Sequence, residues 1–224
     1  MAGKNKLTAK LLLIVDDHPM MRNGLTQLID NEPDLRVAAG ADNARQAMEA
    51  VVKLKLDLIL LDISLPDKNG LELIKDIRTL KPDLAILVVS MHDESIYAER
   101  VLRAGARGYI MKQEGGKKFI QAIRRVLDGG IFVSEKMASR ILELFSGHRP
   151  EDSAAPVTRL SDREFEVFQL IARGVDTRAI ARQLHVSVKT VEAHRVHIKE
   201  KLHLKTAMDL VRYAVRWIET EGKN

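Results

Sequence analysis

The chain has 224 residues, which is long enough for one large domain or for two modest domains that each bury a core. It contains no cysteine, so disulfide bonds and thiolate metal sites are excluded, and a reducing cytoplasm is the expected compartment. The net charge is +5, and residues 158–224 contribute +4 of it, which is compatible with a polyanionic partner. The apolar run at 11–15 is too short for a membrane segment, so we expect a soluble protein with no membrane partner.

Short apolar runs alternate with helical patterns in the first part of the chain. Pro19 is suited to a first helical position, Asn43 to a helix cap, and Gly105 to a left-handed residue after a helix. Five strands alternating with five helices predict a doubly wound α/β domain with a five-stranded parallel sheet at residues 10–130. The predicted strands cover residues 11–15, 35–39, 57–61, 84–89 and 108–111, and the predicted helices cover residues 19–30, 44–54, 70–80, 93–103 and 117–127.

A linker region is predicted at residues 131–157. Residues 134–145 are amphipathic and predict a linker helix, with apolar side chains repeating at helical spacing. The following segment, SGHRPEDSAAPVT, has no apolar periodicity and is typical of a flexible linker. The apolar face of the predicted helix contains Met137, Ile141, Leu144 and Phe145.

The last part of the chain, residues 158–220, is predicted to be an all-α domain of four helices. Leu160 and Ser161 followed by Glu164 form a capping box that opens the first helix. Helices at 177–184 and 188–202 are joined by a tight turn, as in a helix-turn-helix motif, and a fourth helix covers residues 206–217.

Polar residues follow four of the predicted strands. Asp16 and Asp17 follow the first strand, Asp62 the third, Ser90 the fourth and Lys112 the fifth. Because ligands bind outside the carboxyl ends of parallel strands, we expect these five side chains to meet. Three carboxylates, a hydroxyl and an ammonium group suit a divalent cation and a phosphoryl group. An aspartate pair alone would more simply cap a helix, so the prediction depends on the whole set.

The segments around these residues resemble the receiver domain of two-component response regulators. The resemblance is carried by Asp16 and Asp17, LLDISLPDKNGLEL, VVSMHD and ARGYIMK, and covers roughly residues 10–130. It implies a flavodoxin-like fold in which Asp62 accepts a phosphoryl group from a sensor histidine kinase with Mg²⁺. The implied ligands of Mg²⁺ are Asp17, Asp62 and the backbone carbonyl of Ser64, with Asp16 acting through water.

The resemblance also implies how the site responds to phosphate. Lys112 and Ser90 would bind phosphate oxygens, and Ser90 and Tyr109 would form a switch pair. Gln113 stands where many receivers have proline after a cis peptide; a non-proline cis bond costs about 2.5–4 kcal/mol, so the isomer stays open. His92 is expected to be a solvated loop residue, although it could shade the phosphate from water.

The segments LSDREFEV, IARQL and TVEAHR resemble the LuxR-type DNA-binding domain over about residues 158–217. Together the two resemblances place the chain in the NarL/FixJ class of response regulators. The helix at 188–202 would read the DNA, although a solvated helix face is the alternative for any single residue. Val188, Val191, Ile198 and Leu202 are expected to pack inward. Glu192, Ala193 and Val196 would face base edges, and Lys189, Thr190, His194 and Lys199 would lie near phosphates.

These patterns predict a phosphorylation-controlled transcription factor that binds half-sites of double-stranded DNA as a homodimer. The chain would not be an enzyme beyond supporting its own phosphorylation and dephosphorylation. One rival is an aspartate-nucleophile phosphatase, which usually carries an acidic residue two positions after the nucleophile, where this chain has Ser64. Another is a constitutive DNA-binding protein whose receiver no longer accepts phosphate.

Overall fold

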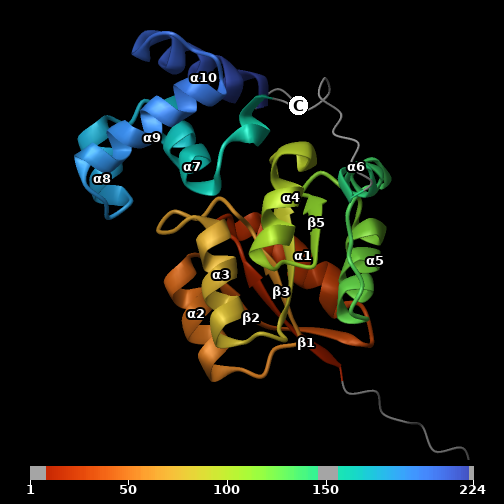
Figure 1. Ribbon diagram of the computed structural model, residues 1–224. Helices are drawn as coiled ribbons and strands as arrows, with labels where there is room; N and C mark the ends of the chain where they lie inside the picture. The colour runs from red at the N-terminus through yellow and green to blue at the C-terminus, as the bar shows by residue number, and fades with distance from the viewer. Residues whose placement is uncertain (1–8, 146–155, 222–224) are drawn as a thin grey trace, which may run out of the picture. The chain divides into compact units, whose positions relative to one another are not determined.

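The computed structural model describes residues 9–145 and 156–221, the side chains of residues 144, 145 and 221 excepted (Figure 1). The chain forms two compact units that divide between Ser146 and Gly147. This division falls inside the segment that the sequence predicts as a linker. Among the described residues, none of the helices is long and apolar enough to cross a membrane.

The first unit contains a five-stranded sheet in the order β2-β1-β3-β4-β5, and all four pairings are parallel. The strand order reverses between β1 and β3, because the chain adds β2 on one side of β1 and all later strands on the other. This is the position at which doubly wound sheets form a crevice. The strands are β1 (Lys10–Val15), β2 (Leu35–Ala41), β3 (Leu58–Leu61), β4 (Ala85–Ser90) and β5 (Gly108–Met111).

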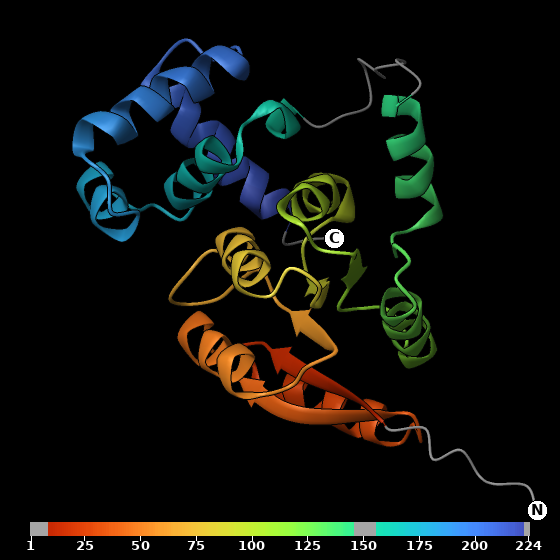
Figure 2. The same ribbon diagram turned by 60° about the horizontal axis from the view of Figure 1, so that its bottom comes forward.

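Helices cover both faces of the sheet, as the doubly wound prediction requires (Figure 2). Leu25 and Ile29 of α1 join Phe119 and Ile123 of α5 in the core on one face, and α2, α3 and α4 cover the other face. The predicted α/β fold is therefore confirmed. The helices are α1 (Pro19–Asp30), α2 (Ala44–Lys53), α3 (Gly70–Leu80), α4 (Glu94–Ala104) and α5 (Gly116–Leu127).

The helix boundaries follow the local signals in the sequence. Pro19 occupies the first position of α1, and Asn43 Oδ1 accepts the Gln46 N–H at 2.9 Å, as a cap should. Gly105 ends α4 in the left-handed conformation with φ 110°. The predicted start of α4 was one residue early, because Asp93 is the cap, not the first helical residue.

The segment after α5 extends the first unit before the second begins. Phe132 pairs in parallel with Gly108 at the edge of β5: the Tyr109 N–H donates to the Phe132 carbonyl at 2.8 Å, and the Phe132 N–H donates to the Arg107 carbonyl at 3.1 Å. Helix α6 (Glu135–Phe145) follows and buries Met137. The predicted inward side chains of Leu144 and Phe145 lie outside the described residues.

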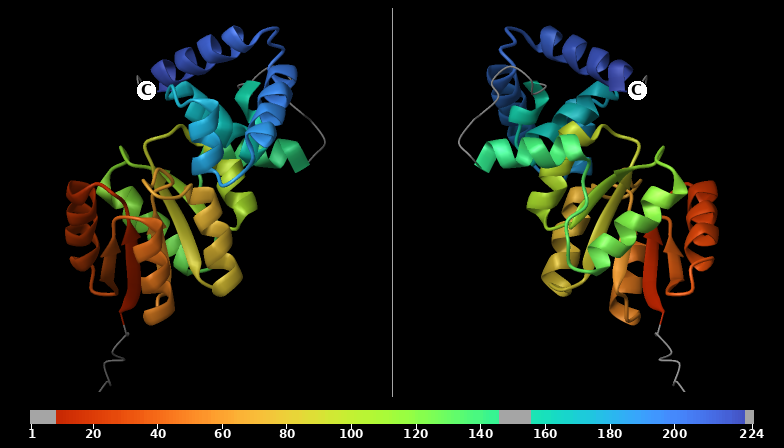
Figure 3. Two further views of the ribbon diagram at one scale, coloured as in Figure 1. Left: turned by 90° about the vertical axis from the view of Figure 1, so that its left-hand side faces the viewer. Right: turned by 90° about the vertical axis from the view of Figure 1, so that its right-hand side faces the viewer.

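The second unit is a bundle of four helices preceded by a short 3₁₀ turn (Figure 3). Phe165 and Phe168 of α7 pack against Trp217 of α10, with ring centroids 5.6 and 5.3 Å apart. The predicted four-helix domain is confirmed. Its elements are η1 (Pro156–Arg159), α7 (Asp162–Ala172), α8 (Thr177–Gln183), α9 (Val188–Lys201) and α10 (Ala207–Glu221).

The capping box at the start of α7 is present as predicted. The Ser161 N–H donates to Glu164 Oε2 at 2.7 Å, and the Glu164 N–H donates back to Ser161 Oγ. Because Glu164 Oε2 also lies 2.6 Å from Lys201 Nζ of α9, this local motif contributes to the packing of the bundle.

Candidate functional site

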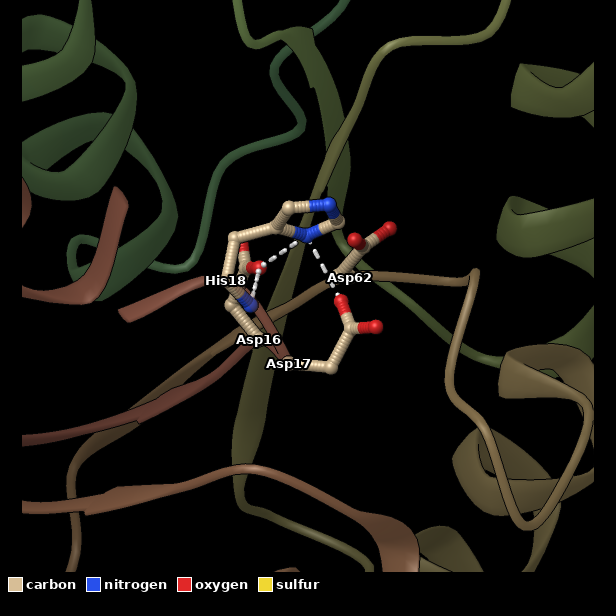
Figure 4. A group of neighbouring side chains, drawn as sticks. All are labelled: Asp16, Asp17, His18 and Asp62. Carbon is tan, nitrogen blue, oxygen red and sulfur yellow. Dashed lines mark hydrogen bonds and ion pairs between the residues drawn. The ribbon is translucent and has the colours of Figure 1, made fainter. Parts of the chain in front are cut away.

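An acidic site lies at the carboxyl ends of β1 and β3, where the strand order reverses. Lys112 Nζ, which follows β5, lies 2.7 Å from Asp16 Oδ2 and 2.6 Å from Asp62 Oδ2. The side chains of Lys112, Asp16 and Asp62 are only 7%, 2% and 3% exposed. Asp17 is half-buried beside them, so the predicted convergence of strand ends brings these four residues together. Figure 4 shows the three aspartates of this group with His18.

Charge within this site is not balanced by Lys112 alone. Burial acts to lower the pKa of Lys112, but hydrogen bonds to Asp16 and Asp62 carry that pKa above its ordinary value. The ammonium group is therefore charged at neutral pH. Three carboxylates against one ammonium group leave an excess of negative charge, which a divalent cation can neutralise.

Two observations show that the residues fit a divalent cation. One oxygen atom each from Asp16, Asp17 and Asp62 and a ring nitrogen of His18 lie within 4.8 Å of one another. Opposite ligands in an octahedral shell around Mg²⁺ lie about 4.2 Å apart, so small shifts would bring such oxygen atoms onto one ion. Asp17 Oδ1 is buried without a hydrogen bond, although His18 Nδ1 lies 2.7 Å away in an ion-pair position. Carboxylate oxygens are the ligands that Mg²⁺ prefers, so this oxygen can contact an ion in addition to His18.

The residues that follow Asp16 form hydrogen bonds to it, but the Asp16 side chain does not cap helix α1. His18, at the cap position of α1, makes no side-chain cap bond, and its N–H donates to Asp16 Oδ1 at 2.8 Å. Arg22 Nη1 donates to the Asp16 carbonyl at 2.5 Å. Neither aspartate caps α1, so the simpler explanation of this aspartate pair does not hold.

The turn after Asp62 keeps its carboxylate at the strand end. The Ser64 N–H donates to Asp62 Oδ1 at 3.0 Å, and Asn69 Oδ1 accepts the Leu71 N–H to cap α3. A Cβ atom on Gly70 would lie 2.4 Å from the Ile63 Cα, so only glycine fits where the chain doubles back.

The β4–α4 loop brings the remaining predicted residues to the same edge. Ser90 is fully buried, and its Oγ accepts the His92 N–H at 3.2 Å. The Tyr109 ring is buried, and its hydroxyl donates to the His92 carbonyl at 2.7 Å. The structure contains no cis peptide among the described residues, so Lys112–Gln113 is trans.

His92 differs from the sequence-based expectation of a solvated loop residue. Its ring Nε2 lies 3.0 Å from Ser64 Oγ, and its ring stacks on Tyr97 of α4 with centroids 4.7 Å apart. The prediction was wrong because the loop folds back over the turn that carries Asp62, and sequence alone does not show such a contact.

The second candidate surface is the outer face of α9. Lys189, Ala193 and Val196 are exposed, and Glu192 is 57% exposed at 3.8 Å from the guanidinium of Arg195. Thr190 lies in the first turn, with its hydroxyl 2.7 Å from Ser187 Oγ. Lys199 and His194 are half-buried at the margins of this face.

The opposite face of α9 packs into the bundle. Val191, Ile198 and Leu202 are buried as predicted, but Val188 is 45% exposed, so its predicted inward position was wrong. Val188 is the first residue of α9, whereas Val191, one turn further on, is fully buried. Lys201 Nζ lies 2.6 Å from Glu164 Oε2 of α7, which fixes the other end of α9.

Comparison with known proteins agrees with this geometry. Residues 12–124 match the response regulator receiver domain, and residues 158–214 match the luxR family of bacterial regulatory proteins. The chain belongs to the response regulators of the NarL/FixJ class. It combines a receiver domain with a LuxR-type DNA-binding domain and is a phosphorylation-dependent transcription regulator.

Its relatives match along almost the whole length of this response regulator. The oxygen regulatory proteins NreC of Staphylococcus haemolyticus and Staphylococcus epidermidis are 36% and 37% identical, and each alignment covers 92% of this chain and 96% of the relative. RcsB from Salmonella enterica serovar Typhimurium, solved bound to promoter rprA in the presence of phosphomimetic BeF₃⁻, matches with a TM-score of 0.73 at 25% identity, covering 93% of this chain and 99% of that one.

Sequence reasoning missed several residues that the structure adds to this response regulator. His18 and Arg22 hold Asp16, and His92 joins Ser64 to α4. Arg195 Nη1 donates to Thr177 Oγ1 at 3.2 Å while its Nε lies near Glu192. The adjacency of His18 to the aspartates was a usable signal, whereas the other contacts depend on loop and helix packing.

Proposed function

We propose that Asp62 accepts a phosphoryl group from a sensor histidine kinase and thereby switches DNA binding by the second unit. The observation that carries this proposal is the buried Asp62 carboxylate, held by Lys112 and Ser64 beside two further aspartates. One Asp62 oxygen would form the bond to phosphorus as the nitrogen–phosphorus bond of the donor imidazole breaks. Lys112 and the Ser90 hydroxyl are placed to bind the phosphoryl oxygens.

We further propose that Mg²⁺ is the cofactor of this step. Asp17, Asp62 and the backbone carbonyl of Ser64 would hold the ion, with Asp16 acting through water. The ion would neutralise the acidic site so that an anionic phosphoryl group can approach. Asp17 Oδ1, which is buried without a hydrogen bond and has only the ion-pair contact with His18 Nδ1, supports this assignment.

For the second unit, we propose that α9 enters the major groove of double-stranded DNA. Glu192, Ala193 and Val196 would face base edges, while Lys189, Thr190, His194 and Lys199 would lie near phosphates. Exposure of this face, with its margins held by Arg195 and Glu164, supports the assignment. Two chains would bind paired half-sites as a homodimer in the cytoplasm.

This function needs no enzymatic activity beyond the phosphorylation and dephosphorylation of Asp62 itself. A phosphatase mechanism would require an acid two positions after the nucleophile, where the Ser64 hydroxyl is hydrogen-bonded to His92. That arrangement favours a stable acceptor over a phosphatase.

The test is incubation with acetyl phosphate and Mg²⁺, followed by intact-mass measurement and DNA-binding titration. We expect one acid-labile phosphoryl group in the unchanged chain and none in Asp62→Asn. Asp76→Asn, which removes a partly exposed carboxylate paired with Lys68, should be modified normally. Unaltered labelling of Asp62→Asn would refute the assignment, and unaltered DNA affinity of the phosphorylated chain would leave a constitutive DNA-binding protein.

A further inference from the structure

The N-terminal end of α4 holds the beginning of α6 through two contacts. The Ser134 N–H donates to Glu94 Oε1 at 2.7 Å, and Arg140 Nη1 donates to the Ser95 carbonyl at 3.2 Å. Glu94 lies in the first turn of α4 and places its carboxylate at the start of α6, and negative charge is favourable at both helix starts. These two contacts are named the α6 latch.

The chain just before the latch is attached to the sheet. Phe132 exchanges main-chain hydrogen bonds with the β5 edge, through the Tyr109 N–H and the Arg107 carbonyl. Ser134 caps the start of α6, since its Oγ accepts the Met137 N–H at 3.1 Å. With Phe132 anchored, the latch sets the direction in which α6 leaves the sheet.

His92 connects the acceptor site to the same end of α4. Its N–H donates to Ser90 Oγ, its carbonyl accepts the Tyr109 hydroxyl, and its ring nitrogen lies 3.0 Å from Ser64 Oγ. Its ring also stacks on Tyr97 of α4. The residue thus contacts the acceptor turn, both predicted switch residues and the helix that carries the latch.

We propose that His92 is a positioning residue that couples occupation of Asp62 to release of the α6 latch, an inference that rests on the proposed function of Asp62. A phosphoryl group on Asp62 attracts the Ser90 hydroxyl, whose rotation withdraws the acceptor of the His92 N–H. The Ser64 N–H, bonded to Asp62, responds to the same group, and the Ser64 hydroxyl transmits this movement to the His92 ring. His92 then shifts against α4, and the Glu94 carboxylate moves away from Ser134.

The test is amide hydrogen exchange at Ser134, measured by NMR on the full chain with Mg²⁺ alone and with Mg²⁺ plus beryllofluoride. In the unchanged chain, exchange should accelerate roughly tenfold on beryllofluoride binding, because a hydrogen bond to a charged acceptor is lost. His92→Phe keeps a ring on Tyr97 but cannot bond Ser64, and Ser64→Ala removes the same bond from the other side. Each variant should reduce the acceleration to below about twofold.

The fluorine resonance of bound beryllofluoride separates the possible failures. Its absence would overturn the proposed function of Asp62 and the coupling with it. If it is present while Ser134 exchange stays unchanged, or if either variant keeps the full acceleration, the coupling alone is overturned.

Two substitutions on α4 serve as controls for the measurement of Ser134 amide exchange. Glu94→Gln weakens the latch and should give fast Ser134 exchange with or without beryllofluoride. Glu99→Gln removes the half-buried partner of the exposed Arg103 on the same helix and should behave like the unchanged chain. Slow exchange in Glu94→Gln, or loss of the response in Glu99→Gln, would overturn the assignment of the latch to Glu94.

Discussion

The acceptor site of the first unit and the outer face of α9 in the second unit keep their charges in opposite environments. Asp16, Asp62 and Lys112 are almost fully buried and bonded to one another, whereas Lys189 and Glu192 are exposed. Buried charges must be matched by close partners to offset their desolvation, and exposed charges need none. The proposed phosphoryl site is thus part of the core of the first unit, whereas the proposed DNA-binding face lies on the surface of the second unit.

This difference predicts how stability and function respond to substitution in the two units. In the first unit, a functional residue is also a structural residue, so its removal should change folding and phosphate chemistry together. In the second unit, the DNA-facing residues can be changed with little effect on the fold. Trp217, the one tryptophan of the chain, is half-buried against Phe165 and Phe168 of the second unit, so its fluorescence reports unfolding of that unit separately.

The largest expected effect is that of Lys112→Met. It leaves the Asp16 and Asp62 carboxylates buried together without a cation, so the first unit should lose about 3–5 kcal/mol of stability at neutral pH. Because the pKa of Lys112 is raised, its contribution is complete below the ordinary lysine pKa of about 10.4 and is lost as the pH rises through the folded value. Urea unfolding followed by circular dichroism measures the loss, and Mg²⁺ should restore part of it.

Lys118→Met is the matched control, because Lys118 pairs with Glu114 at the surface. Its effect should stay below about 1 kcal/mol. Equal losses of stability in the two variants would show that burial does not determine how much a charged residue contributes.

Glu192→Ala should change DNA recognition without changing folding. If Glu192 accepts a hydrogen bond from a cytosine amino group, its loss should relax discrimination at one base pair by about 1–3 kcal/mol. Lys189→Ala should instead weaken binding to all sequences alike and reduce the salt slope by roughly one unit. Competition titrations on operator variants at several salt concentrations separate the two. A uniform loss for Glu192→Ala would show that it mainly orients Arg195.

Glu164→Gln sharpens the comparison, because Glu164 is a buried charge in the unit whose proposed DNA-contacting residues are exposed or half-buried. Burial acts to raise the pKa of Glu164, but Lys201 and the Ser161 N–H hold it below its ordinary value. Its contribution is therefore present above the unfolded pKa of about 4.3 and is lost as the pH falls through the lower folded value.

We expect Glu164→Gln to destabilise the second unit by about 1–2 kcal/mol at pH 7, since the hydrogen bonds to a charged group are lost and Lys201 is partly exposed. The deficit should shrink as the pH falls below about 4. Trp217 fluorescence during urea unfolding at several pH values gives the measurement. Glu200→Gln, on the exposed side of α9, should have no comparable effect, and a pH-independent deficit would contradict the role of the charge.

The smallest effect concerns the end of α9. His203 follows the helix with φ 55°, a left-handed conformation that glycine adopts without strain. His203→Gly should stabilise the second unit by about 0.5–1 kcal/mol, whereas Ala193→Gly inside the helix should destabilise it by a similar amount. Thermal unfolding followed by Trp217 fluorescence shows whether each variant gains or loses stability. Destabilisation by His203→Gly would show that the His203 side chain makes a necessary contact.

The sequence predicted the convergence of the acceptor-site side chains correctly, because parallel strands bring residues that are distant in the chain to one edge of the sheet. Asp16, Asp62 and Lys112 needed only correct strand ends, and apolar runs mark those ends clearly. The contact between His92 and Ser64 depends on the path of a loop, which has no periodic signal. The exposure of Val188 was not predicted, because helical spacing gives the angle of a side chain around the helix axis but not what packs against it at that position.

The attachment of Phe132 to β5 has a consequence for any shortened form of the protein. A fragment that ends at residue 130 would leave the Tyr109 N–H and the Arg107 carbonyl without their main-chain partner. Such an uncovered strand edge is a template for pairing with another chain. An isolated receiver that retains residues 131–134 should stay monodisperse at concentrations at which the shorter fragment associates through β5.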